Sequence, residues 1–363
     1  MKQTISYKQT DIGDGYDAIL IGSGIGSLVT AAALAKAGKK CLILERHYTA
    51  GGYTHVFKRR NYEWDVGIHY IGEVMRETSM LARLFRYVSD GSIKWADMGD
   101  VYDRIRFGDE VFPFVRGREA FVDQLKTAFP DGNDCAAIDT YIELVRSAAR
   151  EARGFFMEKA LPSIAAKVVG GRMRAGFLRH SSKTTLEVMQ SITSNKKLIA
   201  VLTGQYGDYG LPPSRSSFAM HAMVVRHYLG GGAYPVGGSA TIFEGIAPII
   251  LGAGGLIATN AEVKQIVSHR GKVVGVDMAD GRRLTAPIII SGAGVATTSN
   301  RLLSHADAHK TGLKDCLTRV DSSAAHLCAY LGFNEPTPDL NVHPANWWYY
   351  PEVYDHDALL DAF

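Results

Sequence analysis

A cluster of small residues near the N-terminus has the types and spacing that bind a phosphate group. Gly22 would allow a tight turn, and Gly24 would let backbone N–H groups approach a pyrophosphate. Ser27 stands where the common dinucleotide pattern has its third glycine, and it is small enough for close helix packing. Glu45 lies 45 − 22 = 23 residues after Gly22, where a carboxylate can accept a hydrogen bond from a ribose hydroxyl. The predicted contacts in this turn are Gly22, Ser23, Gly24, Gly26 and Ser27.

The elements around the cluster follow the order of a βαβ unit. Residues 17–21 form a short apolar run that predicts a buried parallel strand. Residues 28–37 predict a helix that ends at Gly38, and residues 40–44 predict the second strand. A glycine turn without a ligand is the alternative. The register of strand, turn, helix, strand and acid favours the dinucleotide site.

The composition is that of a soluble globular protein. The chain has 363 residues, with 40 Lys+Arg against 37 Asp+Glu, so its net charge is +3. The length predicts two domains, or one large domain with an insertion. The small net charge argues against a nucleic-acid partner, and the composition against intrinsic disorder. The four cysteines show neither metal-ligand nor disulfide spacing, so no metal site is expected.

The N-terminal residues carry no targeting signal. Residues 1–17 are polar and lack the apolar core of a signal peptide. No run in the chain approaches the ~18 apolar residues of a transmembrane helix. We therefore expect a cytoplasmic protein, and peripheral attachment to a membrane surface stays open.

The residues after Glu45 favour one cofactor over another. Arg46 is followed by a glycine pair, Gly51 and Gly52, and then by an aromatic-Asp-x-Gly segment that contains Asp65 and Gly67. This order resembles the large flavoprotein family that includes amine oxidases, phytoene desaturases and Rab escort-type proteins. The resemblance implies FAD rather than NAD as the tightly held cofactor, with NAD(P)H as a candidate electron donor. It also implies that the glycine pair passes beside the FAD and that the Asp-x-Gly loop lies near the flavin.

A second glycine cluster, at 230–239, precedes the other half of the same pattern. A helix is predicted at 241–251, one strand at 256–267, a β-hairpin at 271–285 and an apolar strand at 287–291. In the flavoprotein family the residue matching Val263 lies over the adenine, and the segment holding Gly292 and Gly294 approaches the cofactor. The implied fold is α/β. It comprises a Rossmann-like FAD-binding domain of the amine oxidase/phytoene desaturase type, made of residues 1–75 and 231–300, and an inserted α+β substrate domain, made of residues 76–230 and 301–363.

Three segments narrow the resemblance. Residues 67–72, 217–228 and 231–239 are similar to the retinol saturase-like branch, whose relatives are carotenoid isomerases and phytoene desaturases. The resemblance implies an FAD-dependent oxidoreductase that reduces, desaturates or isomerises C=C bonds of a retinoid, carotenoid or other isoprenoid lipid. An amine-oxidase-like flavoenzyme and a flavin-free escort-type lipid carrier are the alternatives. Family members continue well past residues 347–350, so we expect a fragment that lacks the C-terminal flavin-closing segment.

The candidate chemistry is hydride transfer at the flavin, with a proton delivered to the second carbon of the double bond. His69, Tyr70 and Tyr234 are the predicted catalytic residues, because they lie in the family-like motifs and could donate that proton. His69 ranks first, since the Asp-x-Gly-x-His loop should face the flavin. His221 and His227 are further candidates. For each histidine the alternative is a core residue bonded to a carbonyl.

Basic and apolar residues are interleaved between residues 154 and 179. This pattern suits a helix pair that lies on an anionic membrane beside the mouth of a lipophilic-substrate site. An ordinary solvated helix surface is the alternative.

Overall fold

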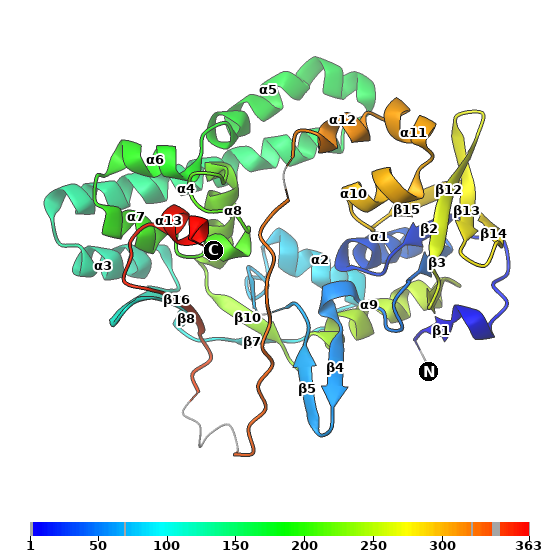
Figure 1. Ribbon diagram of the computed structural model, residues 1–363, viewed down its shortest axis with the longest axis horizontal. Coiled ribbons are helices and arrows are strands. Elements are labelled where there is room, and N and C mark those ends of the chain that lie inside the picture. Colours follow the sequence, from blue (N-terminus) through cyan, green and yellow to red (C-terminus); the bar gives the residue numbers. More distant parts are fainter. Residues whose placement is uncertain (1–2, 69, 321, 336–341, 363) are drawn as a thin grey trace. The chain divides into compact units, whose positions relative to one another are not determined.

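A computed structural model describes residues 3–68, 70–320, 322–335 and 342–362 (Figure 1). The chain forms two compact units, and each is discontinuous in sequence. Unit 1 comprises Met1–Tyr70, Arg76–Ala96 and Tyr234–Ser322. Unit 2 comprises Ile71–Met75, Asp97–Ala233 and Ser323–Phe363.

The division between the units differs from the expected domain boundaries at residues 71–75 and 231–233, which lie in unit 2, and at two longer segments. Residues 76–96 lie in unit 1, because helix α2 (Met80–Ser89) packs against helix α9 (Ala240–Gly252). Residues 301–322 also lie in unit 1, because α11 (His305–Lys310) and α12 (Leu313–Leu317) pack on the π-helical turn η4 (Thr298–Leu302).

Unit 1 is built on a parallel five-stranded sheet with the strand order β1-β11-β3-β2-β15. Every residue of β2 and β3 is buried, as continuous apolar strands of a covered parallel sheet require. Helix α1 connects these two strands and packs against both of them. The expected βαβ unit is thus present. Its bounds and those of the other strands are β1 Ile5–Ser6, β2 Ala18–Ile21, α1 Ile25–Lys36, β3 Cys41–Leu44, β11 Leu256–Thr259 and β15 Ile288–Ser291.

A small antiparallel sheet covers one face of the parallel sheet. Alternate residues of the parallel strands, Ile19, Ile21, Leu42 and Leu44, share one core with apolar residues of this second sheet. The alternation follows from strand geometry, because successive side chains point to opposite faces. The strands of the antiparallel sheet are β12 Val263–His269, β13 Lys272–Met278 and β14 Arg283–Thr285.

The prediction of one strand at 256–267 is wrong. The segment divides into β11, in the parallel sheet, and β12, in the antiparallel one. Asn260, between them, has a φ of 53°, which ends the extended conformation. Asparagine tolerates this left-handed region better than most residues, so the chain turns there from one sheet to the other.

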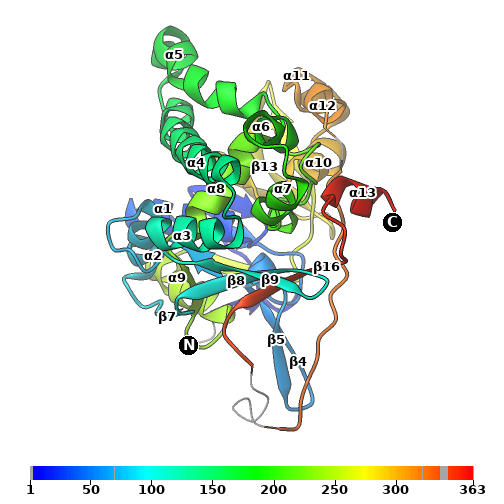
Figure 2. The same ribbon diagram turned by 90° about the vertical axis from the view of Figure 1, so that its left-hand side faces the viewer.

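Unit 2 is mainly helical and includes a three-stranded sheet. Helices α4 (Gly132–Lys159) and α5 (Ser163–Ser181) form a long hairpin, and α8 (Phe218–Tyr228) packs against both of them (Figures 1 and 2). Strands β8 (Val101–Phe107) and β9 (Glu110–Val115) form the predicted hairpin, and β16 (Asn346–Tyr350) pairs in parallel with β8.

None of the helices in the described ranges is long and apolar enough to cross a bilayer.

The chain passes between the units within β7 (Trp95–Asp97) and β10 (Gly232–Pro235). The other elements are η1 Tyr7–Gln9, η2 Gly52–Thr54, β4 Val56–Arg59, β5 Tyr62–Asp65, β6 Ile71–Gly72, α3 Arg118–Ala128, α6 Thr185–Ile192, α7 Lys196–Leu202, η3 Tyr206–Asp208, α10 Val295–Thr297 and α13 His356–Asp361.

Candidate functional site

The glycine turn between β2 and α1 forms an open cradle at the helix N-terminus. Gly22 has a φ of +89°, and its N–H donates to the Leu44 carbonyl over 2.8 Å, which fixes the turn against β3. A Cβ added to Gly24 or Gly26 would meet no atom within 4 Å. The first turn of α1 has no acidic residue and no side-chain cap. The positive end of the helix therefore borders open space, which suits an anion.

Glu45 is held beside this cradle by main-chain and side-chain contacts. Its Oε2 accepts hydrogen bonds from the N–H and the hydroxyl of Ser23 over 2.8 and 2.7 Å. Its Oε1 accepts from the His47 N–H over 2.8 Å. Each carboxylate oxygen can accept more than one hydrogen bond, so capacity for a ribose hydroxyl remains. The Glu45 carboxylate is thus held in a fixed orientation at the end of β3.

The Gly51–Gly52 turn packs directly against the cradle. The Gly51 N–H donates to Ser23 Oγ over 3.0 Å. A Cβ on Gly52 would lie 2.8 Å from the Gly24 Cα, and Gly52 has a φ of +57°. Glycine is required at this position both by the close approach and by the backbone conformation.

The end of β15 completes the cluster. The Gly292 N–H donates to the Ile21 carbonyl over 2.8 Å, and any side chain at Gly292 would collide with Ser27 Oγ. Ser27 Oγ is buried and has no hydrogen-bond partner among the residues that the structure describes. Gly294, with a φ of +83°, lies in open space at the start of α10. Eight of the predicted cofactor residues therefore meet at one edge of the sheet: Gly22, Ser23, Gly24, Ser27, Glu45, Gly51, Gly52 and Gly292.

These observations fit a dinucleotide. The open positions at Gly24 and Gly26 leave room that a side chain would fill, and a buried hydroxyl of Ser27 lacks a partner. The fixed carboxylate of Glu45 supplies an acceptor for a ribose. Phosphate, ribose and backbone contacts are thus all available within unit 1.

Asp65 belongs to a second cluster, which also contains Tyr234. Asp65 Oδ1 accepts from the Ser239 N–H over 2.9 Å and from the Ser239 hydroxyl over 2.6 Å, and Oδ2 accepts from the Tyr234 hydroxyl. Burial, with a further effect of the Asp65 carboxylate, raises the pKa of Tyr234. The phenol therefore stays protonated at neutral pH and can act as a hydrogen-bond donor. Sequence analysis missed Ser239, although it ends the GGAYPVGGS segment.

The other residues of the Asp-x-Gly loop are placed only in part. His69, the first choice for catalysis, lies outside the described residues. Tyr70 is buried, with 3% of its surface exposed. Gly67 is exposed, and an added Cβ would lie 2.7 Å from the Tyr53 ring, so this glycine permits that ring to pack over the loop.

The two further histidine candidates lie in unit 2 and have partners there. His221 is fully buried, with Tyr141 OH 2.8 Å from its Nε2 and Tyr209 OH 3.1 Å from its Nδ1. Burial lowers the pKa of His221 to about 3, so it stays neutral at physiological pH. His227 accepts the Gly72 N–H over 2.8 Å. Both histidines thus have structural hydrogen bonds within unit 2.

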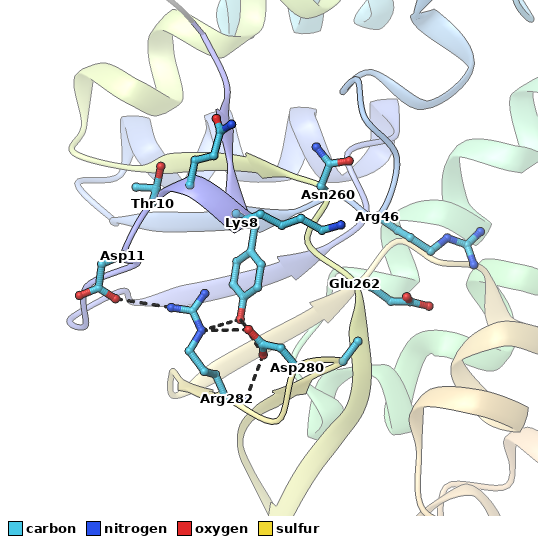
Figure 3. A pocket seen from close by; sticks show the side chains of 11 residues that line it. Lys8, Thr10, Asp11, Arg46, Asn260, Glu262, Asp280 and Arg282 are labelled. Carbon is cyan, nitrogen blue, oxygen red and sulfur yellow. Dashed lines mark hydrogen bonds and ion pairs between the residues drawn. The ribbon is translucent and has the colours of Figure 1, made fainter.

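Unlike Glu45, Arg46 is not part of the glycine cluster. It lines an open cleft of about 810 Å³ that the N-terminal segment borders (Figure 3). In this cleft Arg282 Nε donates to Tyr7 OH over 2.8 Å, and Tyr7 OH donates to the Asp280 carboxylate over 3.0 Å. Glu262 lines the cleft, whereas the adjacent Val263 is buried in the core between the two sheets.

Comparisons with known proteins agree with this geometry. A family model described as an NAD(P)-binding Rossmann-like domain matches residues 20–88. The human all-trans-retinol 13,14-reductase is 34% identical over the whole of this chain, which covers 60% of that protein. Weaker relatives are the prolycopene isomerase of Arabidopsis thaliana, 27% identical over 83% of this chain and 51% of the isomerase, and the lycopene-forming phytoene desaturase of Pantoea ananas, 24% identical over 95% of this chain and 70% of the desaturase. The chain spans about three fifths of the length of the reductases.

Solved structures share the fold at low sequence identity. An oxidoreductase from Methanosarcina mazei has a TM-score of 0.57 at 19% identity, over 81% of this chain and 64% of that one. The cyclohexylamine oxidase of Brevibacterium oxydans has a TM-score of 0.52 at 18% identity, over 79% of this chain and 60% of that one. The expected α/β fold of the amine oxidase type is therefore confirmed.

Proposed function

From its similarity to all-trans-retinol 13,14-reductases, prolycopene isomerases and a phytoene desaturase, we propose that this chain belongs to their family and acts as an FAD-dependent oxidoreductase on C=C bonds of a lipophilic polyene. Retinoids, carotenoids and other isoprenoid lipids are the substrate class. The observation that carries the proposal is the cluster of Gly22, Ser23, Gly24, Glu45 and Gly52 at the edge of the parallel sheet.

The residues of this cluster have distinct roles toward FAD. The N–H groups at the start of α1 bind the pyrophosphate, and Glu45 accepts a hydrogen bond from the ribose of the adenosine. Gly51 and Gly52 would let the backbone approach the cofactor closely, and Gly294 would leave open space at the start of α10. When bound, FAD supplies the hydride chemistry at the double bond.

The proposed proton donors are the residues near the Asp-x-Gly loop. His69 remains the first candidate, with Tyr70 and Tyr234 as alternatives. Tyr234 is protonated at neutral pH, as a donor requires, although its raised pKa makes it a weaker acid than a free tyrosine. NAD(P)H is the proposed electron donor for the reductive direction.

FAD binding is tested first, and the reaction with a polyene substrate second. The purified chain, incubated with FAD and freed of excess ligand, should retain the absorbance bands of a flavin. If the polyene is reduced, flavin that has been reduced anaerobically by NADPH or dithionite should be reoxidised by all-trans-retinol or a lycopene isomer. If the polyene is desaturated, phytoene should instead reduce the oxidised flavin, and isomerisation should leave the redox state of the flavin unchanged. Chromatography of the extracted lipids then identifies reduction, desaturation or isomerisation.

Two outcomes separate the competing functions. A chain that binds retinol or a carotenoid but never retains FAD would be a lipid carrier of the escort type. Anaerobic reduction of the oxidised flavin by a primary amine, with no reaction with any polyene, would assign the chain to amine oxidation instead.

A further inference from the structure

The α4–α5 hairpin of unit 2 has one face fixed by internal packing. The ring centroids of Phe155 and Phe177 lie 4.5 Å apart between the two helices. Gly154 allows the close approach, because an added Cβ would lie 2.7 Å from the Met173 carbonyl oxygen. Since this side of α5 is held against α4, the opposite side of α5 is left exposed.

That exposed side carries a continuous apolar stripe. Ile164, Val168, Gly171, Ala175 and Leu178 follow one another at intervals of four, three, four and three residues, which places them on one side of an α-helix. Ile164 and Val168 are each 79% exposed and Leu178 is 45% exposed. Exposed apolar stripes of this length are unusual on a solvated helix and mark an interaction surface.

The end of α4 extends the stripe. Phe156 and Met157 lie in its last turn and are 56% and 62% exposed. They come directly before the turn that leads into α5 at Ser163. The tip of the hairpin therefore presents large apolar side chains from both helices.

Cations flank the stripe, and the acids that contact α5 lie on its buried side. Lys167, Arg172 and Arg179 lie three or four residues from stripe positions, and within the described ranges they form no ion pair. Glu151 lies against Gly176 and Glu158 against Gly170, and both glycines are buried. Glu158 is itself buried, with Lys159 Nζ 2.9 Å and Arg174 Nη1 3.2 Å from its carboxylate oxygens. The hairpin surface is thus apolar along its centre and positive along its edges.

We propose that the hairpin surface formed by α5 and the end of α4 docks on an anionic lipid bilayer. Apolar side chains of an interfacial helix enter the acyl boundary, while flanking Lys and Arg reach the lipid phosphates. A protein segment without acidic residues would cover the apolar stripe but leave the three cations unpaired, whereas the phosphates of an anionic bilayer would pair with all of them. This inference deepens the proposed function by giving the source of a water-insoluble substrate, but it rests on residues separate from the cofactor cluster.

Vesicle sedimentation tests the docking surface with the 363-residue chain. One variant removes the cations (Lys167→Gln, Arg172→Gln, Arg179→Gln), and a second removes apolar surface (Ile164→Ser, Val168→Ser, Leu178→Ser). A matched control removes three exposed cations of the β12–β13 hairpin (Lys264→Gln, Arg270→Gln, Lys272→Gln). The vesicles contain phosphatidylcholine with or without phosphatidylglycerol.

The unmodified chain should bind the anionic vesicles and bind neutral ones much more weakly. Removal of the three cations should weaken binding about a hundredfold, since each Lys or Arg near an anionic surface contributes about fivefold. The apolar variant should lose at least tenfold, and the control should stay within about twofold. Circular dichroism should be the same for all four proteins.

The docking proposal is wrong if the unmodified chain does not bind anionic vesicles at low salt. It is also wrong if the β12–β13 control loses as much vesicle affinity as the cation variant. A chain that forms a dimer, binds no vesicles and becomes monomeric in the apolar variant would assign the surface to self-association instead. Flavin absorbance, measured on the same samples, keeps the two proposals apart. Vesicle binding by a chain that never retains flavin would leave docking intact and remove the redox function.

Discussion

The hydroxyl of Ser23 donates to Glu45 Oε2 over 2.7 Å, from a side chain that has no exposed surface. The same hydroxyl accepts the Gly51 N–H over 3.0 Å. One serine therefore joins the turn after β2, the end of β3 and the Gly51–Gly52 turn. Because the carboxylate is oriented by the protein itself, a ribose need not order it on binding, which lowers the entropic cost of association.

Ser23→Ala should weaken both the fold and the cofactor site. The substitution leaves the buried Gly51 N–H without its acceptor and removes one donor from Glu45, so we expect ~1–3 kcal/mol lower stability. FAD affinity should fall about tenfold, the equivalent of ~1.4 kcal/mol. Urea unfolding and a flavin titration measure the two effects. Thr30→Ala, which removes an exposed hydroxyl bonded within α1, is the control and should change neither by more than about 0.5 kcal/mol.

Substitutions at two glycines of the site should affect different properties, FAD binding in one case and stability in the other. Gly24→Val places a side chain in open space, so the protein should fold with near-native stability but lose FAD, because the valine occupies the phosphate position. Gly52→Ala should instead destabilise the fold by ~1–3 kcal/mol, because its Cβ would collide with Gly24 and its φ is positive. Thermal unfolding and flavin absorbance separate the two classes. A folded Gly24→Val protein that binds FAD normally would move the cofactor elsewhere.

The elements that could be predicted from the sequence are those that a single local pattern defines. Strands β2 and β3 are continuous apolar runs that flank a glycine turn, so their type, and the positions of Gly22 and Glu45, could be predicted. Strand β1 was missed, because its two residues show no periodicity and pair with β11 far along the chain. The bond between Asp65 and Ser239 was missed for the same reason, since it joins residues 174 positions apart.

Tyr234→Phe should lower stability without removing the cofactor cluster. The variant loses a hydrogen bond to the Asp65 carboxylate, so we expect a loss of ~1–3 kcal/mol at pH 7. The pKa of Tyr234 is raised in the folded state, so its contribution is present in full below the unfolded pKa of about 10 and is lost as the pH rises above it. The difference in unfolding free energy between the two proteins should therefore shrink above pH 10.

Guanidine unfolding across pH 7–11 measures the Tyr234 effect. Tyr48→Phe, at a tyrosine that is 63% exposed, is the control. If Tyr234 were also the proton donor, substrate reduction in the phenylalanine variant would slow while FAD affinity stayed unchanged. Equal stability of the variant and the unmodified chain at pH 7 would contradict the role of the bond to Asp65.

Asp208→Asn should stabilise unit 2 at neutral and alkaline pH. Burial, with a smaller effect of Asp103, raises the pKa of Asp208 to about 7, against about 3.9 in an unfolded chain. Between these values the folded state holds a proton that the unfolded state has released, so stability falls as the pH rises, by at most ~1.4 kcal/mol per pH unit. Asparagine has the same shape and carries no such proton. The unfolding free energy of the variant, relative to that of the unmodified chain, should therefore increase from pH 4 to pH 7 and stay constant above pH 7.

The low pKa of His221, about 3, acts in the opposite direction below pH 6.5, because the unfolded histidine then binds a proton that the folded one does not. His221 is present in both proteins, so it cancels in the difference between their unfolding free energies. Asp123→Asn, at an exposed carboxyl on α3, is the control and should show no such trend. A difference between Asp208→Asn and the unmodified chain that stays flat from pH 4 to pH 8 would mean that Asp208 ionises normally in the folded protein.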